Sequence, residues 1–424
     1  MKSTARKRYY HMVFVVLLSV SLLCLGCTPA EEPIEGEQPD TESPVEEVAG
    51  EPIKIGMIQP ITGPIAASGT ALRDGARIYA EYINDQGGIN GRPIDLIVED
   101  SANDPAMAAS AFNKLISRDK VLAVIGAWGS SPTLAVVPLA KQNEIPLVVD
   151  TASNYKVTDK NEEGSPWIFR VTAPTIMESR VLSAILIDDL GLKNPYILSV
   201  NNDWGRGTAD VFTAYYEGEG YPVGGVDYLD QAETNYQVNL TKILSSGADS
   251  IILTADAAQA ALVVEQASGL GLDLPILAPG LSCSMYKITK LAGMEAAEGF
   301  MQTAAYIGSV DPMMTADPEG ARYFNETWEA KGYDVIEIQE AAKGWDSLMV
   351  LCEAMKTIDS DKISSASIRD ALENVEAPGI CFGNIKFEEW ENFIFQNVPP
   401  VSVVGVIDGK YSVILEPTKP IPEN

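Results

Sequence analysis

From residue 53 onward, short apolar runs alternate with segments that have the spacing of amphipathic helices, and this alternation is the feature that most constrains the fold. Alternating strands and helices form layered α/β domains on mainly parallel sheets. The predicted strands are residues 53–58, 94–99, 121–126, 146–149, 195–200, 250–254 and 274–278. The folded part, about 370 residues, is longer than one hydrophobic core usually serves, so two lobes are predicted.

The first predicted helix shows the helical pattern clearly. Leu72, Ala76, Tyr79 and Ile83 follow one another at spacings of four, three and four residues, which places them on one buried stripe, and a pair of glycines then ends the helix. The later predicted helices are residues 106–116, 133–141, 176–190, 208–219 and 257–268. Residues 167–172 interrupt the alternation halfway, and we interpret them as a crossover between the lobes.

The loops that follow the predicted strands carry the distinctive side chains of the chain. Ligands of open parallel sheets bind beyond the carboxyl ends of the strands, where backbone N–H groups and helix N-termini converge. Here those loops are residues 59–69, 127–131, 150–154, 201–207, 255–256 and 279–282. Some are rich in small hydroxyl residues and others carry Asp or Trp, which predicts a cleft for a small zwitterion or carboxylate between the lobes.

Several motifs of these loops resemble one family. They are Ile-Thr-Gly-Pro-Ile-Ala-Ala-Ser-Gly at 61–69, Gly-Gly-Ile-Asn-Gly-Arg-Pro at 87–93, Val-Glu-Asp-Ser-Ala-Asn-Asp-Pro at 98–105, Val-Ile-Gly at 124–126 and Asp-Trp-Gly-Arg-Gly at 203–207. In order and spacing they are similar to the leucine/isoleucine/valine-binding proteins of ABC importers, from residue 53 to about residue 413.

The resemblance implies a type I periplasmic binding protein. Its two Rossmann-like lobes, with mainly parallel sheets, would be joined by three crossovers and would close over a ligand by hinge bending. The expected first lobe is residues 53–172 with 299–398. The expected second lobe is residues 173–298 with 399–424.

The resemblance also implies ligand-binding residues. The Ser130 hydroxyl and the amides beside it, including that of Ser131, would bind a ligand carboxylate, whereas a carbonyl and a side chain of the loop Ala152, Ser153 and Asn154 would meet the ammonium and carboxylate. Asn154 stands where branched-chain amino acid binders have Thr, and Trp204 where they have Tyr.

Two further departures from the family pattern bear on the ligand. Gly280 replaces the Glu that pairs with the ligand ammonium, and Ser68 replaces a Trp. Asp256 is the better candidate for the missing counter-charge, and Asp203 is the other. Either Asp256 replaces the Glu and the ligand is an amino acid, or neither carboxylate enters the cleft and the ligand is an aromatic or aliphatic carboxylate without an ammonium. These departures put branched-chain amino acids in doubt as ligands, but not the family.

Each candidate residue has a structural alternative. Ser130 and Ser131 could cap a helix that begins near Thr133, and Asp256 could cap the helix that begins at Ala257. Trp204 could belong to a core, although a strand end is a poor place for it, and Trp128 is a candidate for the cleft lining. The candidate ligand-binding residues are therefore Trp128, Ser130, Ser131, Ala152, Ser153, Asn154, Trp204 and Asp256.

Composition argues against several classes of function. The single histidine, His11, lies in the N-terminal segment, so the folded part has no imidazole for catalysis or for zinc, and no Gly-x-Ser-x-Gly motif is present. We therefore expect no enzyme, metal site or cofactor. Cys283, Cys352 and Cys381 are interpreted as buried apolar residues, although one disulfide is possible. A net charge of −29 also argues against nucleic-acid binding.

The segment ahead of the folded part predicts its location. Residues 1–26 start with basic residues, and the apolar stretch that follows is too short to span a membrane. The segment ends at Gly26, directly before Cys27, and resembles a bacterial lipoprotein signal peptide, in which Cys27 would carry diacylglycerol. An uncleaved signal anchor is the alternative. Residues 27–52 are expected to form a lipidated cysteine and a tether, because 28–51 contain nine acidic residues, four prolines and no basic residue.

Together these features predict a lipid-anchored protein at the outer face of the cell membrane, touching the membrane only through its lipid. It would bind an amino acid or small carboxylate and deliver it to an ABC permease. A sensory receptor of the same fold that signals to a partner protein is the alternative.

Overall fold

The computed structural model describes residues 50–159, 167–280, 285–304, 311–391 and 393–418, which all belong to one compact unit, Glu46–Asn424. The predicted leader, Cys27, most of the tether and Cys283 lie outside these residues. In the described part of the chain, no helix is long and apolar enough to cross a membrane.

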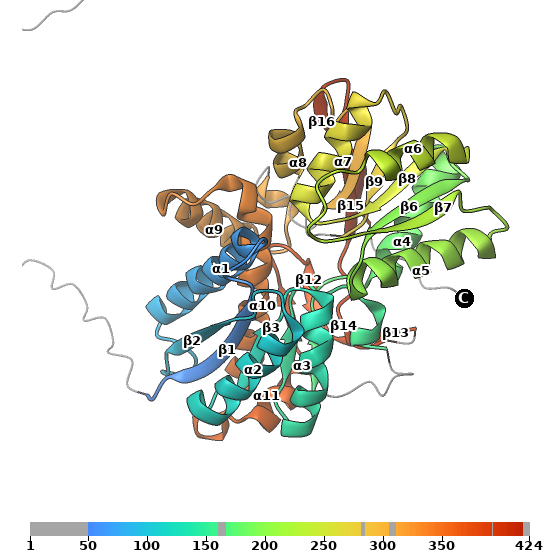
Figure 1. Ribbon diagram of the computed structural model, residues 1–424. Helices are drawn as coiled ribbons and strands as arrows, with labels where there is room; N and C mark the ends of the chain where they lie inside the picture. Colours follow the sequence, from blue (N-terminus) through green and yellow to red (C-terminus); the bar gives the residue numbers. More distant parts are fainter. Residues whose placement is uncertain (1–49, 160–166, 281–284, 305–310, 392, 419–424) are drawn as a thin grey trace, which may run out of the picture. The chain divides into compact units, whose positions relative to one another are not determined.

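The first of two large sheets has the strand order β13-β14-β5-β4-β3-β1-β2 (Figure 1). Its strands are β1 (Ile53–Gln59), β2 (Ile94–Asp100), β3 (Ala123–Gly126), β4 (Leu147–Val149), β5 (Ile168–Arg170), β13 (Glu388–Trp390) and β14 (Phe393–Gln396). Neighbouring strands are parallel except β13 and β14. The central strands β3 and β4 are buried along their whole length, as expected for parallel strands covered on both faces.

The second sheet has the order β16-β15-β10-β9-β8-β6-β7. Its strands are β6 (Pro195–Val200), β7 (Gly225–Leu229), β8 (Ser250–Thr254), β9 (Ile276–Ala278), β10 (Phe300–Ala304), β15 (Val401–Ile407) and β16 (Lys410–Thr418). The strands from β7 to β10 are parallel, and β15 and β16 add an antiparallel edge. A separate hairpin consists of β11 (Glu376–Pro378) and β12 (Asn384–Lys386).

Helices cover both faces of each sheet, and the apolar side chains divide accordingly. On the first sheet, Ile55 and Met57 pack with α1 and α10, whereas Ile58 packs with α2 and α3. On the second sheet, α6, α7 and α8 cover one face and α4 and α5 the other. We call each sheet with its helices a lobe.

The helices have the following bounds: α1 (Ala66–Asp85), α2 (Pro105–Lys114), α3 (Ser130–Asn143), α4 (Thr175–Ala184), α5 (Asp203–Gly218), α6 (Gln237–Ser246), α7 (Ala257–Gly269), α8 (Met285–Ala292), α9 (Pro318–Ala330), α10 (Ile338–Lys356) and α11 (Ser365–Leu372). Single π-helical turns extend α2 and α4, at η1 (Leu115–Asp119) and η4 (Ile185–Asp189). Short 3₁₀ helices are η2 (Tyr155–Val157), η5 (Pro312–Met314), η6 (Val335–Glu337) and η7 (Ser360–Lys362).

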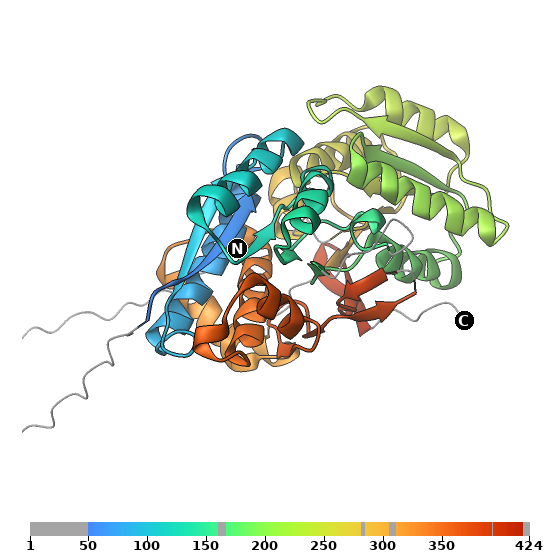
Figure 2. The ribbon, with the colours of Figure 1, turned by 90° about the horizontal axis from the view of Figure 1, so that it is seen from below.

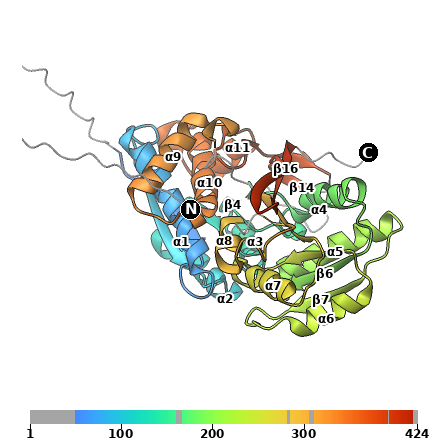
Figure 3. The ribbon, with the colours of Figure 1, turned by 90° about the horizontal axis from the view of Figure 1, so that it is seen from above.

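Helices α1 and α10 lie side by side although they are far apart in the sequence (Figure 3). Two glycines allow this close approach: a Cβ atom at Gly75 would overlap the Ala341 carbonyl, and one at Gly344 would overlap the Leu72 carbonyl. The pair forms much of the first lobe's core and holds the N-terminal part of that lobe to its C-terminal part.

The strands predicted from the sequence are all present, and two predictions about the crossovers need correction. Residues 167–172 are not only a crossover, because β5 pairs with β4 in the first sheet and the chain leaves the lobe after Arg170. The predicted return to the first lobe at 298/299 is wrong. Phe300 and Met301 pair with Ile276 and Leu277 of β9, so β10 still belongs to the second lobe.

The crossovers meet at a buried polar junction beside β5 and β14. Arg170 is fully buried and donates to Gln396 Oε1 at 2.6 Å, while the Gln396 amide donates to the Thr172 carbonyl at 2.8 Å. Asn397 donates to the Val171 carbonyl at 3.0 Å. The outgoing and returning chains are thus bonded to each other between the lobes, and Figure 2 shows the red C-terminal strands there.

Several carboxyl groups are buried within the lobes. Burial raises the pKa of Asp150 to about 6, of Asp346 to about 7 and of Glu178 to about 8, and hydrogen bonds or the nearby Lys343 only partly offset it. Asp346, for example, accepts hydrogen bonds from the amides of residues 380, 381 and 382 at 2.8–2.9 Å.

These carboxyl groups predict that the protein is more stable at pH 5 than at pH 8. Since each pKa is higher in the folded than in the unfolded chain, the folded state binds more protons between about pH 4 and pH 8, and its stability falls as pH rises through this window. Urea unfolding at constant ionic strength measures the difference, and Glu178→Gln should reduce it. A free energy of unfolding that rises from pH 5 to pH 8 would contradict the expectation.

Candidate functional site

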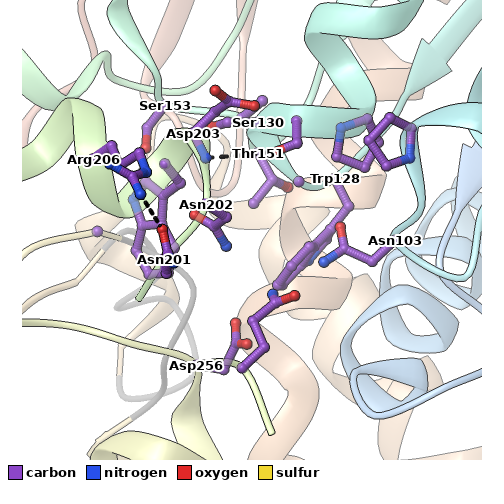
Figure 4. A pocket seen from close by; sticks show the side chains of 18 residues that line it. Asn103, Trp128, Ser130, Thr151, Ser153, Asn201, Asn202, Asp203, Arg206 and Asp256 are labelled. Atoms are coloured by element: carbon purple, nitrogen blue, oxygen red, sulfur yellow. Dashed lines mark hydrogen bonds between the residues drawn. The ribbon is translucent and has the colours of Figure 1, made fainter. Parts of the chain in front are cut away.

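A cavity of about 370 Å³ has walls from both lobes (Figure 4). Its lining consists of loops that follow β2, β3, β4, β6, β7, β8 and β9 and of the helix starts behind them. From the first lobe come Asn103, Pro105, Trp128, Gly129, Ser130, Ser131, Pro132, Thr151, Ala152 and Ser153. From the second lobe come Asn201, Asn202, Asp203, Trp204, Arg206, Gln231, Asp256 and Gly280. Of the eight candidate residues, only Asn154 does not line it.

Trp128 forms a rigid part of the first lobe's wall. Its backbone is in the left-handed region at φ +62°, and its amide donates to Asp150 Oδ1 at 3.4 Å. The indole Nε1 donates to Glu340 Oε2 at 3.3 Å, and Lys343 pairs with the other oxygen of that carboxylate at 2.5 Å. The ring is therefore held by α10, and Trp128, although only 6% exposed, lines the cavity.

Ser130 and Ser131 do not cap a helix that begins near Thr133, because α3 begins at Ser130 itself and its N-cap is Gly129. The Ser130 Oγ accepts a hydrogen bond from the Asn154 amide at 3.2 Å, and the Ser131 Oγ accepts one from the Asp203 amide at 3.3 Å. Each hydroxyl proton is then available to another acceptor. The first N–H groups of a helix also lack intrahelical partners, so this helix end favours an anion.

The loop after β4 contains a residue that the sequence analysis missed. Thr151 lines the cavity, and its buried Oγ1 has no hydrogen-bond partner. Ala152 and Ser153 line the cavity too, while the Ser153 carbonyl accepts from the Thr175 amide at 2.8 Å. A hydroxyl residue in the loop after β4 could have identified Thr151 as a candidate from the sequence. That its hydroxyl lacks a hydrogen-bond partner is evident only from the structure.

Asn154 lies at the contact between the lobes and not in the cavity lining. Its Nδ2 donates to the Asp203 carbonyl at 2.6 Å, and its Oδ1 accepts from the Lys156 amide at 2.9 Å. Its own carbonyl accepts from Arg170 at 2.7 Å. The protein itself therefore uses most of the hydrogen-bonding capacity of Asn154.

Trp204 lies in the first turn of α5, which begins at Asp203 and so earlier than predicted. Asn202 caps this helix by accepting from the Gly205 amide at 3.0 Å. The indole is half-buried, lies against Gly280 and lines the cavity, so it is not a core residue. A Cβ atom at position 280 would lie 3.0 Å from Trp204 Cζ2, and Gly280 has φ +97°. The ring therefore occupies space beside the residue 280 backbone.

Asp256 stands at the N-cap position of α7, but its side chain makes no capping hydrogen bond, so capping does not explain it. The carboxylate is half-buried and lines the cavity. Burial raises its pKa to about 6, against the opposing effect of Lys287. A carboxylate in this position is suited to a cation.

Arg206 is a further lining residue that was not proposed from the sequence. Its Nη2 donates to Asn201 Oδ1 at 2.6 Å, and its guanidinium lies 4.7 Å from the centre of the Tyr228 ring. It adds a positive charge to the second lobe's wall. Arg206 lies in the polar loop that follows β6, and this position in the sequence could have identified it as a lining residue.

Three ion pairs between described residues link the lobes away from the cavity, and one of them joins Arg180 of α4 to Glu391, which follows β13, with Nη2 and Oε2 3.0 Å apart. Lys287 of α8 pairs with Glu337 of η6 at 2.6 Å, and the Ser68 hydroxyl donates to the same Glu337 at 3.4 Å. Lys290 and Asp334 are 3.8 Å apart but largely exposed, so that pair contributes little.

The described residues contain no group of three metal-ligating side chains. Cys352 and Cys381 are buried and not joined to each other, and burial raises the pKa of both thiols, so neither is activated as a nucleophile.

The contact between Gly280 and Trp204 generates a prediction. Gly280→Ala should move the indole, because the new Cβ would meet it at 3.0 Å, and should change tryptophan emission and ligand affinity. Gly293→Ala is the matched control, since φ is +90° there and nothing lies within 4 Å. Both variants should lose roughly 1 kcal/mol of stability from backbone strain. Identical emission changes in the two variants would contradict the role of the contact.

Comparison with known proteins identifies the relatives of this fold. The family model described as "Periplasmic binding protein" matches residues 52–405. A leucine-, isoleucine-, valine-, threonine- and alanine-binding protein of Pseudomonas aeruginosa is 27% identical over 347 residues, which are 81% of this chain and 87% of that protein.

Solved structures agree with the family assignment. The branched-chain amino acid substrate-binding protein LivJ of Streptococcus pneumoniae, in complex with isoleucine, is 26% identical with a TM-score of 0.74, over 87% of this chain and all of that one. A solute-binding protein of R. palustris in complex with benzoate shares the fold at 20% identity, with a TM-score of 0.74 over 88% of this chain and 98% of that one. The relatives bind solutes and are not enzymes, and the chain belongs to the periplasmic binding protein family, among solute-binding proteins of the branched-chain amino acid transporter type.

Proposed function

We propose that this protein captures an amino acid or a related small carboxylate outside the cytoplasm and delivers it to an ABC permease. The observation that carries the proposal is a cavity with walls from both lobes that ends, on the first lobe's side, at the start of α3 and at the unpartnered Thr151 hydroxyl. Isoleucine and benzoate, the ligands of two structural neighbours, both contain a carboxylate.

In this proposal the carboxylate binds to the first lobe. The free N–H groups of Ser130 and Ser131 and the Thr151 hydroxyl donate hydrogen bonds to it, and the helix end adds a favourable dipole. Ala152 and Ser153 shape the same wall, Asn154 holds the loop against α5, and Trp128 and Trp204 supply apolar surface. Asp256 would bind a cationic group of the ligand.

Closure of the lobes completes the site. We propose that residues 53–170 with 311–396 and residues 175–304 with 401–418 move as rigid bodies about the polar junction at Arg170. The Lys287–Glu337 pair, whose side chains are 21% and 14% exposed, stabilises the closed arrangement. Closure removes water, so each hydrogen bond to the ligand counts for more than it would in an open cleft.

The test of this function is ligand binding with a matched pair of variants. We expect calorimetry or thermal shift to find a small carboxylate with a dissociation constant near the micromolar range, about −8 kcal/mol. Thr151→Val should weaken its binding about tenfold, or about 1.4 kcal/mol, because a hydrogen bond to the carboxylate is lost.

Thr254→Val is the control, since the Thr254 Oγ1 is also buried without a partner but does not line the cavity. It should leave binding unchanged. If a screen of amino acids and of aliphatic and aromatic carboxylates finds no ligand, the proposed function is wrong. Equal losses in the two variants would remove Thr151 from the site.

We also propose that Cys27 carries a lipid that anchors the protein at the outer face of the membrane. The proposal rests on the basic and apolar residues before Gly26-Cys27 and on the acidic, proline-rich residues 28–51 that would separate the folded part from the bilayer.

Cys27→Ser should abolish labelling by radioactive fatty acid and either release the protein from membranes or leave an uncleaved precursor. Ligand affinity of the folded part should not change, because every residue that lines the cavity belongs to the lobes, from Asn103 to Gly280. Label that persists in the variant would refute lipidation at this cysteine.

A further inference from the structure

The cavity has chemically different ends. Ser130 and Thr151 lie at one end, and Figure 4 shows Asp256 at the other, with the Trp128 side chain between them. The first end presents hydroxyl and N–H donors at a helix N-terminus, and the second presents a carboxylate from the opposite lobe. An anionic group therefore suits the first end and a cationic group the second.

The Asp256 carboxylate is not committed to another group of the protein. It makes no capping bond to α7, although it stands at the N-cap. Lys287 is the positive charge that lowers the pKa of Asp256, but its ammonium pairs at 2.6 Å with Glu337 of the other lobe. The neighbouring Tyr236 hydroxyl donates to the Glu233 carbonyl. Closing the lobes over Asp256 without a ligand cation would leave a poorly compensated charge in the cavity, which is unfavourable.

An α-amino acid does not match this arrangement. Its ammonium and carboxylate are attached to one carbon atom, so a carboxylate bound at Ser130 and Thr151 would keep the ammonium at the same end of the cavity. A cation that reaches Asp256 has to be carried on the far side of the ligand body. The Trp128 indole, which lines the cavity between the two ends, suits an apolar body, and an indole also attracts a nearby cation.

We propose that the ligand is a small zwitterion whose cationic group is separated from its carboxylate by a flat or short apolar body, with the carboxylate at Ser130 and Thr151 and the cation at Asp256. The inference rests on the proposed function and specifies its ligand class. Trp204 adds a second aromatic side chain to the lining, from the second lobe, and Gly280 gives this ring its space.

Isomer pairs test the inference, because they keep composition and size constant and change only the distance between the charges. The flat pair is 4-(aminomethyl)benzoate and 2-phenylglycine, and the flexible pair is 5-aminopentanoate and 2-aminopentanoate. The reference carboxylates 4-methylbenzoate and pentanoate keep the anionic group and lack the cation. Calorimetry with the full folded chain should find that the separated-charge isomer of at least one pair binds tenfold or more tightly than its α-amino isomer.

Asp256→Asn should weaken the separated-charge isomer at least tenfold and should not weaken the reference carboxylate, which has no cation to lose its partner. Asp203→Asn is the control for a general effect of charge. It removes a carboxylate at the other end of the lining and should affect the zwitterion and the reference carboxylate by the same factor. Circular dichroism and the unfolding midpoint of each variant exclude misfolding as the cause of a loss.

The outcomes distinguish this inference from the proposed function. Tighter binding of the α-amino isomers, or equal effects of Asp256→Asn on the zwitterion and the reference carboxylate, would overturn the ligand class and leave carboxylate capture intact. If no probe binds and the wider carboxylate screen also fails, both proposals fall together.

Discussion

The buried guanidinium of Arg170 is the interaction on which the arrangement of the site depends. A charged group out of water is tolerated only when its donors are satisfied. Arg170 donates to the Asn154 carbonyl at 2.7 Å, to Gln396 at 2.6 Å and to the Thr158 hydroxyl, and burial lowers its pKa to about 9, which still leaves it charged at neutral pH. One side chain thus fixes the loop after β4, the start of the first crossover and the last strand of the first lobe.

The two glycines of the Asp-Trp-Gly-Arg-Gly motif are explained by the same packing. A Cβ atom at Gly205 would overlap the Val200 carbonyl, so glycine lets α5 start directly over the end of β6. A Cβ atom at Gly207 would lie 2.7 Å from the side-chain Nδ2 of Asn154, so the second glycine lets α5 approach the first lobe. Both serve close backbone approach, and neither belongs to a phosphate-binding loop.

The sequence was sufficient to predict β1–β4, β6, β8 and β9 and the side of the sheets that carries the cavity, since apolar runs and polar strand ends are local features. It did not predict β5 as a strand, and it did not predict β7, β10 or the later strands. It failed where the information is not local. Helices α3 and α5 begin earlier than predicted because their first turns, with Ser130 and Asp203, carry polar residues that face the cleft and lack the apolar spacing. Strand β10 belongs to the second sheet because it pairs with β9 and β15, which are distant from it in the sequence or follow it. Whether the Thr151 hydroxyl finds a hydrogen-bond partner depends on the packing around it, and it finds none.

The residues that hold the scaffold and the residues that line the cavity are largely different. Arg170, Gln396 and Asn397 bond to the backbone of both crossovers and do not line the cavity. The side chains of Thr151 and Asp256 line the cavity and make no hydrogen bond that supports the fold. Such a division lets lining residues change at little cost to folding, because substitutions away from the buried scaffold usually change stability little. Trp204 and Gly280 are an example of such lining residues in this chain. The Trp204 indole occupies the space that a side chain at position 280 would need.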